Sequence, residues 1–139
     1  MRDRNIGAYI KPADSVRPQP AAASVNGQAV DRSGYLSAQL LAYVGATTGT
    51  PTSFTVDVKL QDSATSGGTY ADLTPAADYA VAQIVAVNLL KWKNVDLSKA
   101  RPFIRAVATI AFVGGTSPTI QVACPIILGG ADTLPTATA

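Results

Sequence analysis

The sequence predicts an all-β fold, either an antiparallel β-sandwich or a jelly-roll-like barrel. Residues 54–61 alternate strictly between apolar and polar side chains, which is the period of a strand with one buried face. Similar short runs recur along the chain and are separated by turns rich in glycine and proline. All nine acidic residues are aspartate, and the absence of glutamate, a good helix former, argues against a helix-rich fold.

The first predicted strands lie between residues 33 and 73. Residues 33–44 form a core strand in which alternate side chains, from Leu36 to Val44, face the interior. In the next strand the interior face consists of Phe54, Val56, Val58 and Leu60. Small residues at 63–69 then predict a hairpin loop, and a return strand follows at 70–73.

The second half of the chain predicts further strands. Residues 79–87 are rich in valine and alanine and fit either a buried strand or a short helix. Residues 88–97 and 103–113 predict two strands, the second of them apolar on both faces apart from Arg105 and Thr109. The last strand covers residues 119–128. Its Pro125 cannot donate a ladder hydrogen bond, which predicts an edge strand or a bulge.

The two ends of the chain differ from this body. We predict an extended N-terminal arm over residues 1–34, a sandwich body over 35–130 and a C-terminal tail over 131–139. The arm combines three prolines with five of the eleven basic residues, namely Arg2, Arg4, Lys11, Arg17 and Arg32. Such an arm either contacts a neighbouring subunit or wraps around its own sandwich. On the first alternative, deletion of residues 2–30 weakens attachment to a partner and leaves the body folded.

The composition argues against catalysis. The chain has no histidine, so neither a Ser-His-Asp triad nor an imidazole zinc site can be built. The single cysteine, Cys124, lies in an apolar run, which predicts a buried structural thiol. We therefore predict no enzyme activity, no catalytic residues, no metal and no cofactor. Spaced aspartates such as Asp57 and Asp62 are assigned to turns and solvated faces.

Charge and hydropathy bear on partners and location. The net charge is only +2 and the basic residues are scattered, so nucleic acid is not predicted as a partner. No apolar run has the length of a membrane-spanning helix, and the N-terminus lacks the apolar stretch of a signal peptide. The expectation is a protein made in the host cytoplasm, with no membrane partner.

Two segments together resemble a protein family. The first is VDVKLQDSATSGGTYADL, and the second is VDLSKARPFIRAVATI followed by GGTSPTIQVACPIILGG. In order and spacing they resemble the head decoration, or capsid cement, proteins of tailed bacteriophages, over about residues 54–130. The resemblance implies a virion protein on the capsid surface whose partners are the major capsid protein and sibling copies. It implies no catalytic residues.

The candidate protein-contact residues are basic or aromatic, as is common in interfaces. They are Arg2, Arg4, Tyr9, Lys11, Arg17, Tyr35, Trp92 and Arg105. Trp92 is interpreted as a core or interface anchor, with a sugar-stacking platform as the alternative. Arg105 is interpreted as an outward-facing arginine or a partner of Asp96, with a capsid contact as the alternative.

The function predicted from the sequence is therefore structural: a non-enzymatic virion protein that decorates and stabilises a tailed-phage capsid by bridging capsid subunits. Two alternatives stay open. One is a carbohydrate-binding β-sandwich module, and the other is a tail or neck component of the same virion. Homo-oligomers or lattice neighbours are expected in either virion role.

Overall fold

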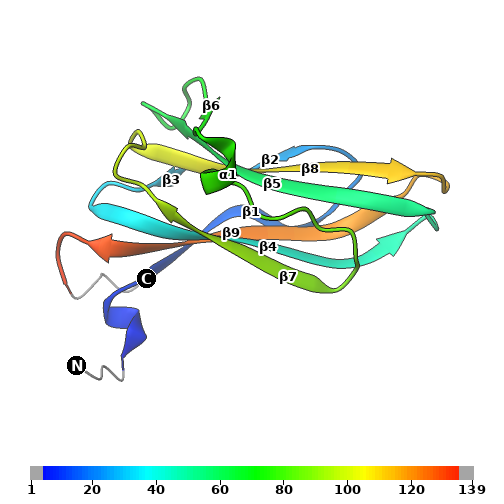
Figure 1. Cartoon of the computed structure of the whole chain (residues 1–139), viewed down its shortest axis with the longest axis horizontal. Coiled ribbons are helices and arrows are strands. Elements are labelled where there is room, and N and C mark those ends of the chain that lie inside the picture. Colours follow the sequence, from blue (N-terminus) through cyan, green and yellow to red (C-terminus); the bar gives the residue numbers. More distant parts are fainter. Residues whose placement is uncertain (1–4, 135–139) are drawn as a thin grey trace.

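A computed structural model describes residues 5–134 of the chain and shows two antiparallel sheets packed face to face (Figure 1). This arrangement confirms the predicted β-sandwich. Sheet A has the strand order β1-β9-β4-β7, with β1 (Lys11–Ala21), β9 (Thr119–Ala131), β4 (Tyr35–Thr48) and β7 (Leu89–Asp96). Sheet B has the order β2-β8-β5-β6, with β2 (Val25–Asn26), β8 (Phe103–Val113), β5 (Ser53–Ser63) and β6 (Ala71–Asp72). The short strand β3 (Val30–Asp31) also pairs with β8.

The core lies between the two sheets and follows the predicted alternation. In β5 the buried side chains include Phe54, Val56, Val58 and Leu60, as predicted. In β9 every second side chain is buried, namely Ile120, Val122, Cys124, Ile126 and Leu128. β4 contributes Ala38, Leu40, Ala42 and Val44 from the facing sheet. Leu36 is the exception to its predicted set, because it lies near the start of β4 and is 52% exposed.

The predicted arm is part of the sandwich. β1 pairs along its length with β9, and β2 and β3 pair with β8 of the other sheet. Residues 11–31 therefore lie against their own sandwich, which is the second of the two settings considered for the arm, and the body begins earlier than the predicted residue 35. The physical reason is that Val16, Ala21 and Val30 bury their side chains in the core, despite the prolines around them. Pro12, Pro18 and Pro20 are tolerated because β1 is an edge strand of sheet A.

A junction at Ser15 joins the two sheets along one side of the sandwich. The Ser15 hydroxyl donates to the carbonyl oxygen of Gln28 at 2.9 Å and accepts from the backbone N–H of Ala106 in β8 at 2.8 Å. The N–H of Gly27 donates to the carbonyl oxygen of the same Ala106 at 2.8 Å. Sheet A and sheet B are therefore connected by hydrogen bonds as well as by apolar packing.

Pro125 is accommodated by a bulge, one of its two predicted settings. β9 is a central strand between β1 and β4. Its register with β1 shifts between Asp14, which pairs with Pro125, and Val16, which pairs with Cys124. The extra residue of the bulge is Ser15, which lies on β1, the strand paired with this part of β9.

Residues 79–87 form neither the buried strand nor the short helix considered for them from the sequence. A single turn, α1 (Ala76–Tyr79), is followed by an extended segment that touches β5 through two isolated bridges, Lys59 to Ala80 and Val56 to Ile84. Ile84 and Val81 are buried against the core. This segment closes the edge of β5 before the chain crosses to β7 in sheet A. At the N-terminus, the short 3-10 turn η1 (Ile6–Ala8) precedes β1.

Candidate functional site

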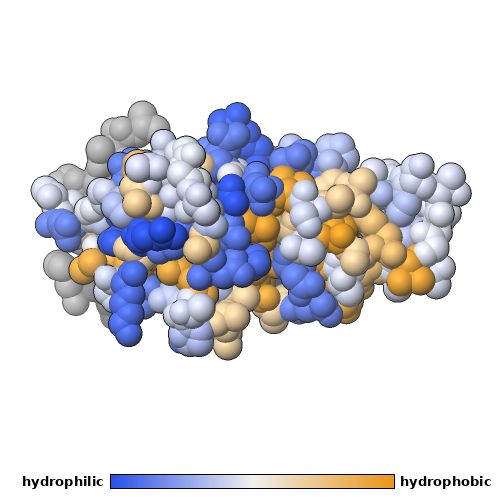
Figure 2. Space-filling model, turned by 90° about the horizontal axis from the view of Figure 1, so that it is seen from above, coloured by the Kyte–Doolittle hydropathy of each residue, from blue (hydrophilic) through white to orange (hydrophobic). Residues whose placement is uncertain are grey.

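The outer face of sheet B carries a polar region around β5, β6 and β8 whose side chains are hydrogen-bonded to one another. Asp72 accepts from Lys59 and from Gln61, each at 2.7 Å, and Gln83 donates to Asp57 at 3.0 Å. Arg105 donates to the side-chain oxygen of Gln61 at 2.8 Å and lies 4.2 Å above the ring of Tyr70. Figure 2 looks onto this side of the molecule, where hydrophilic residues cover much of the left half and centre. Each of these charged side chains has a polar partner within this face. Hydrophobic residues cover part of the right half of the same side (Figure 2).

The outer face of sheet A has a different character. Its two central strands, β4 and β9, contain no aspartate, glutamate, lysine or arginine at any position. The side chains that point away from the core include a set of apolar and aromatic residues that we call the apolar face: Leu41 and Tyr43 from β4, Leu90 and Trp92 from β7, and Ala123, Pro125 and Ile127 from β9. Trp92 is 57% exposed, Tyr43 53% and Leu90 41%. Together these residues form an uncharged surface that is exposed to solvent.

The register of sheet A places these residues next to one another. Leu41 pairs with Trp92, and Tyr43 pairs with both Leu90 and Ala123. Leu40 pairs with Ile126, which puts Leu41 opposite Pro125 on the other side. Asp14 of β1 pairs with Pro125 in turn. A single row of side chains therefore crosses the sheet from Asp14 through Pro125 and Leu41 to Trp92.

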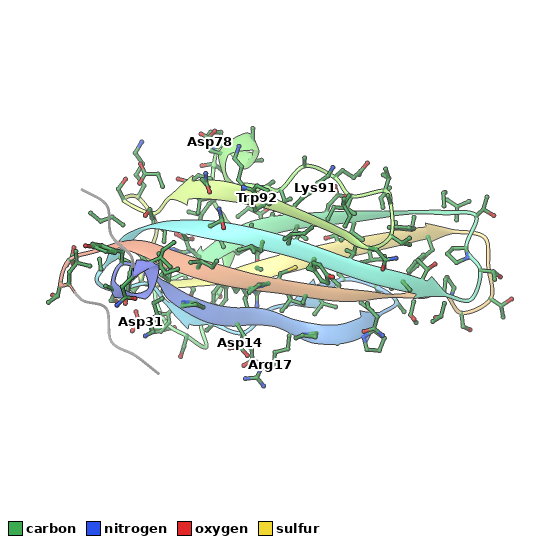
Figure 3. All side chains as sticks on the ribbon, turned by 90° about the horizontal axis from the view of Figure 1, so that it is seen from below. Asp14, Arg17, Asp31, Asp78, Lys91 and Trp92 are labelled. Atoms are coloured by element: carbon green, nitrogen blue, oxygen red, sulfur yellow. The ribbon has the colours of Figure 1, made fainter. Side chains whose placement is uncertain are left out.

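The β1 edge of this face carries a pair of charges, which the centre of the face lacks. At the β1 edge, Arg17 forms a 2.5 Å ion pair with Asp14, and this hydrogen bond lowers the pKa of the Asp14 carboxyl. Figure 3 looks onto sheet A and shows Asp14 and Arg17 at the β1 edge, with Trp92 at the opposite, β7 edge. Lys91 and Lys93 alternate with Trp92 along β7 and belong to its other side, where the Lys91 ammonium donates to the Gln83 carbonyl oxygen at 3.0 Å.

A shallow groove of about 590 Å³ lies at the end of sheet A nearest to η1. Its apolar lining includes Ile6, Ile10, Leu36 and Ile127. Its polar lining includes Gln39 and Asn94, whose side chains are hydrogen-bonded at 3.0 Å. Asp96 is the one charged group in the lining, and a hydrogen bond from the Ser98 backbone N–H lowers its pKa. The groove extends the apolar face toward the N-terminus and has the character of a contact surface.

The reactive groups of the chain do not gather at this face. Cys124 is fully buried, as predicted, and burial raises the pKa of its thiol to about 12, so it carries no thiolate at neutral pH. Within residues 5–134 no three histidine, cysteine or acidic side chains are placed to hold a metal ion. In the same span, no helix has the length and apolarity needed to cross a bilayer.

The predicted contact residues are distributed over the whole molecule. Arg17 and Trp92 lie at the two edges of the apolar face. Lys11 is exposed at the start of β1, and Tyr9 and Tyr35 are partly buried. Arg105 lies on sheet B, facing outward as predicted, and its partner is Gln61. Asp96, the partner considered for Arg105, instead accepts from Ser98. Arg2 and Arg4 lie outside the described residues.

Trp92 was predicted to be either a core or an interface anchor, and the structure excludes the core setting. In β7 the inward positions are occupied by Leu89, Lys91, Lys93 and Val95, so the tryptophan faces solvent. The remaining residues of the apolar face were not singled out from the sequence. The sequence did contain a signal for this face. The segments that form β4 and β9 have no charged residue, and the first of them places Leu41 and Tyr43 on the face opposite its core residues. A strand with only one buried face normally carries charged residues on the other.

Comparison with known proteins adds little. No protein-family model matches the chain, and no curated protein matches its sequence. Among solved structures, the crystal structure of the SPBc2 prophage-derived protein YomS is similar with a TM-score of 0.42 and 13% identity, over 85% of this chain and 94% of that one. A likeness at this level carries no argument about function. The function has to be argued from the residues themselves.

Proposed function

We propose that this chain is a non-enzymatic structural protein of a tailed-phage virion, which decorates the capsid and stabilises it by bridging major capsid subunits. The observation that carries the proposal is the apolar face, with Trp92 and Tyr43 more than half exposed on an uncharged sheet surface. A contiguous apolar patch on a soluble protein is commonly a protein-contact site. The family resemblance of residues 54–130 supports the virion setting.

The rest of the molecule is consistent with a role in assembly. The core is packed, and no described buried side-chain polar atom lacks a hydrogen-bond partner. The one thiol, that of Cys124, is buried. A rigid body with one apolar face can bind to many equivalent places on a lattice, where multivalent contact raises avidity.

The test is to compare virions that contain this chain with virions from which its gene has been deleted. We expect the protein to be present on wild-type heads in a fixed ratio to the major capsid protein, measured by quantitative mass spectrometry. Heads without it should release their genome at a lower temperature. A protein absent from purified virions would refute the proposal. A protein found only on tails or necks, by electron microscopy of labelled particles, would favour the alternative tail or neck role.

A second candidate function is carbohydrate binding, because two exposed aromatic residues lie close together on the apolar face. Trp92 lies diagonally across the β4–β7 pair from Tyr43, a spacing at which two rings form a common platform. Sugars stack on such exposed rings. A glycan array probed with the wild-type protein and with Trp92→Ala tests this idea. A specific signal that the variant loses would favour it over the virion role.

A further inference from the structure

We infer that the apolar face is covered by a second copy of this chain, with the outer faces of two A sheets packed against each other around a twofold axis parallel to the strands. The inference rests on the proposed role of this face as an assembly surface, and it names the partner. A twofold contact uses the same patch on both copies, so the patch must be complementary to itself. The distribution of charge and aromatic residues across sheet A has this property.

The register shows how the two copies would match. The row Asp14–Pro125–Leu41–Trp92 crosses the sheet from the β1 edge to the β7 edge. The twofold axis runs parallel to the strands, between the two copies and above the gap between β9 and β4. Rotation about it exchanges the two edges of the sheet. It leaves each residue at the same height along the strand direction. The β1 edge of one copy then lies over the β7 edge of the other; Figure 3 shows these two edges on a single copy. Pro125 of each copy lies over Leu41 of the other.

This exchange brings a cation onto an exposed indole. Asp14 is the β1 end of the row that ends at Trp92. Arg17 follows Val16, the partner of Cys124, and reaches this row through its exposed guanidinium, which is bonded to Asp14. In the paired arrangement the Arg17 guanidinium of each copy meets the Trp92 ring of the other, a favourable cation–π contact that occurs twice. Asp14 remains neutralised by its own Arg17, so no unpaired charge is buried between the copies.

The centre of the contact is free of charge. β4 and β9 contribute only uncharged side chains, so two copies meet there without repulsion between like charges. The amides of Gln39 and Asn94 are already hydrogen-bonded to each other. Two twisted sheets stack in this way at about −30° in many sandwiches.

The edge of sheet A is less suited to self-association than its face. Sheet A has two edge strands, β1 and β7. The prolines of β1 oppose strand addition at that edge, whereas the backbone of β7 would be open to it. Its side chains Lys91 and Lys93 stand between the exposed apolar ones, and lysines on an edge strand oppose pairing with another copy. Copies therefore meet through their faces and form closed pairs.

The area of the apolar face limits the expected affinity of the dimer. Four strands about 4.8 Å apart, with about eight residues each at about 3.4 Å, give a footprint of about 500 Å² per copy. About 1,000 Å² for the pair lies at the low end for a specific interface. We expect a reversible dimer with a dissociation constant of roughly 10 µM or weaker.

Sedimentation equilibrium of the purified full chain, from about 10 µM to about 1 mM, tests the inference. The wild type should change from monomer to dimer over this range. Trp92→Ala should raise the dissociation constant at least about tenfold, because the contact is made twice. Leu41→Asp should leave a monomer throughout, since it places a charge at the centre of the contact. Val113→Ser is the matched control, because Val113 is 62% exposed and lies on β8 of sheet B. It should leave the constant unchanged.

Circular dichroism of each variant verifies that it is folded. An Arg17→Ala and Trp92→Ala double-mutant cycle should show that the two losses are not additive. A wild type that stays monomeric to about 1 mM overturns the inference, as does a dimer that neither Trp92→Ala nor Leu41→Asp weakens.

Virion attachment separates this inference from the proposed function. A monomer whose binding to virions is lost in Trp92→Ala would mean that a capsid subunit covers the face. The proposed function would then stand and the inference would fail. A dimer that is absent from virions would leave the inference standing and refute the proposed function.

Discussion

At the scale of the residue, Asp62 is the only charged side chain that is buried among the described residues. Its carboxylate accepts from the backbone N–H of Arg101 at 2.9 Å and from the Arg101 guanidinium at 2.8 Å. The same guanidinium donates to the Asp62 carbonyl oxygen at 2.6 Å, and the pair raises the pKa of Arg101. These contacts fix the turn between β7 and β8 to β5. Nothing in the sequence pairs residues 62 and 101.

We predict that Asp62→Ala lowers the free energy of unfolding by about 2 kcal/mol, because it removes charge-assisted hydrogen bonds and leaves a backbone donor without a partner. Asp72→Ala is the control. Its ion pair with Lys59 is half exposed, so the loss should stay below about 1 kcal/mol. Urea unfolding followed by circular dichroism measures both. Equal losses in the two variants would show that burial of Asp62 adds nothing.

At the scale of the element, the junction between β1 and β8 depends on a glycine. A Cβ atom at Gly27 would lie 2.7 Å from the carbonyl oxygen of Ala106 and would collide with the Ser15 hydroxyl. The Gly27 backbone can approach β8 closely only because it has no side chain. The sequence shows a glycine at this position but gives no sign that it faces another sheet.

We predict that Gly27→Ala destabilises the protein by about 1–3 kcal/mol, since the added methyl forces Ser15 and β8 apart. Gly67 offers a matched control, because a Cβ atom there meets nothing within 4 Å. Gly67→Ala should change the stability by less than about 0.5 kcal/mol. Thermal unfolding of both variants decides, and a neutral Gly27→Ala would mean that the junction is loose.

The placement of β1 also changes the expectation for truncation. Deletion of residues 2–30 was expected to leave a folded body. In the structure this deletion removes the partner of β9 and the core residues Val16, Ala21 and Val30. We now predict that the truncated chain fails to fold, and that deletion of residues 2–9 leaves the cooperative unfolding transition in place. Differential scanning calorimetry of the two truncations measures this. A cooperative transition in the longer deletion would show that sheet A does not need β1.

At the scale of the whole molecule, few types of side chain can titrate between acid and neutral pH. The sequence has no histidine and no glutamate, and its one thiol has a pKa of about 12. Hydrogen bonds lower the pKa of Asp14, through Arg17, and of Asp31, through the Ser33 backbone N–H. The pKa of Asp72 is lowered by Lys59, and that of Asp96 by the Ser98 backbone N–H.

These shifts predict the pH dependence of stability. A carboxyl whose pKa is lower in the folded than in the unfolded protein stabilises the fold above its ordinary pKa of 3.8. That contribution is lost as the pH falls through the folded value. We expect the free energy of unfolding to be nearly constant from about pH 5 to 8 and to fall progressively below about pH 4. Denaturant titrations over this range test the expectation, and a step between pH 6 and 7 would contradict it.

The sequence by itself determined the strands of the body that have one buried face, from β4 and β5 to β9. The alternation in β5 and β9 and the buried Cys124 follow from it, because a period of two residues depends only on near neighbours in the chain. It also indicated Arg17 and Trp92 as contact residues, without indicating that they share a face.

The tertiary structure alone decided where the strands lie relative to one another. It placed β1 in sheet A, where the sequence predicted an arm, and it set β4 beside β9. The apolar face exists only through this second pairing, since neither strand forms a surface by itself. The physical reason is that strand order depends on which distant segments bury their apolar faces against each other and complete their backbone hydrogen bonds, and no local pattern encodes that choice.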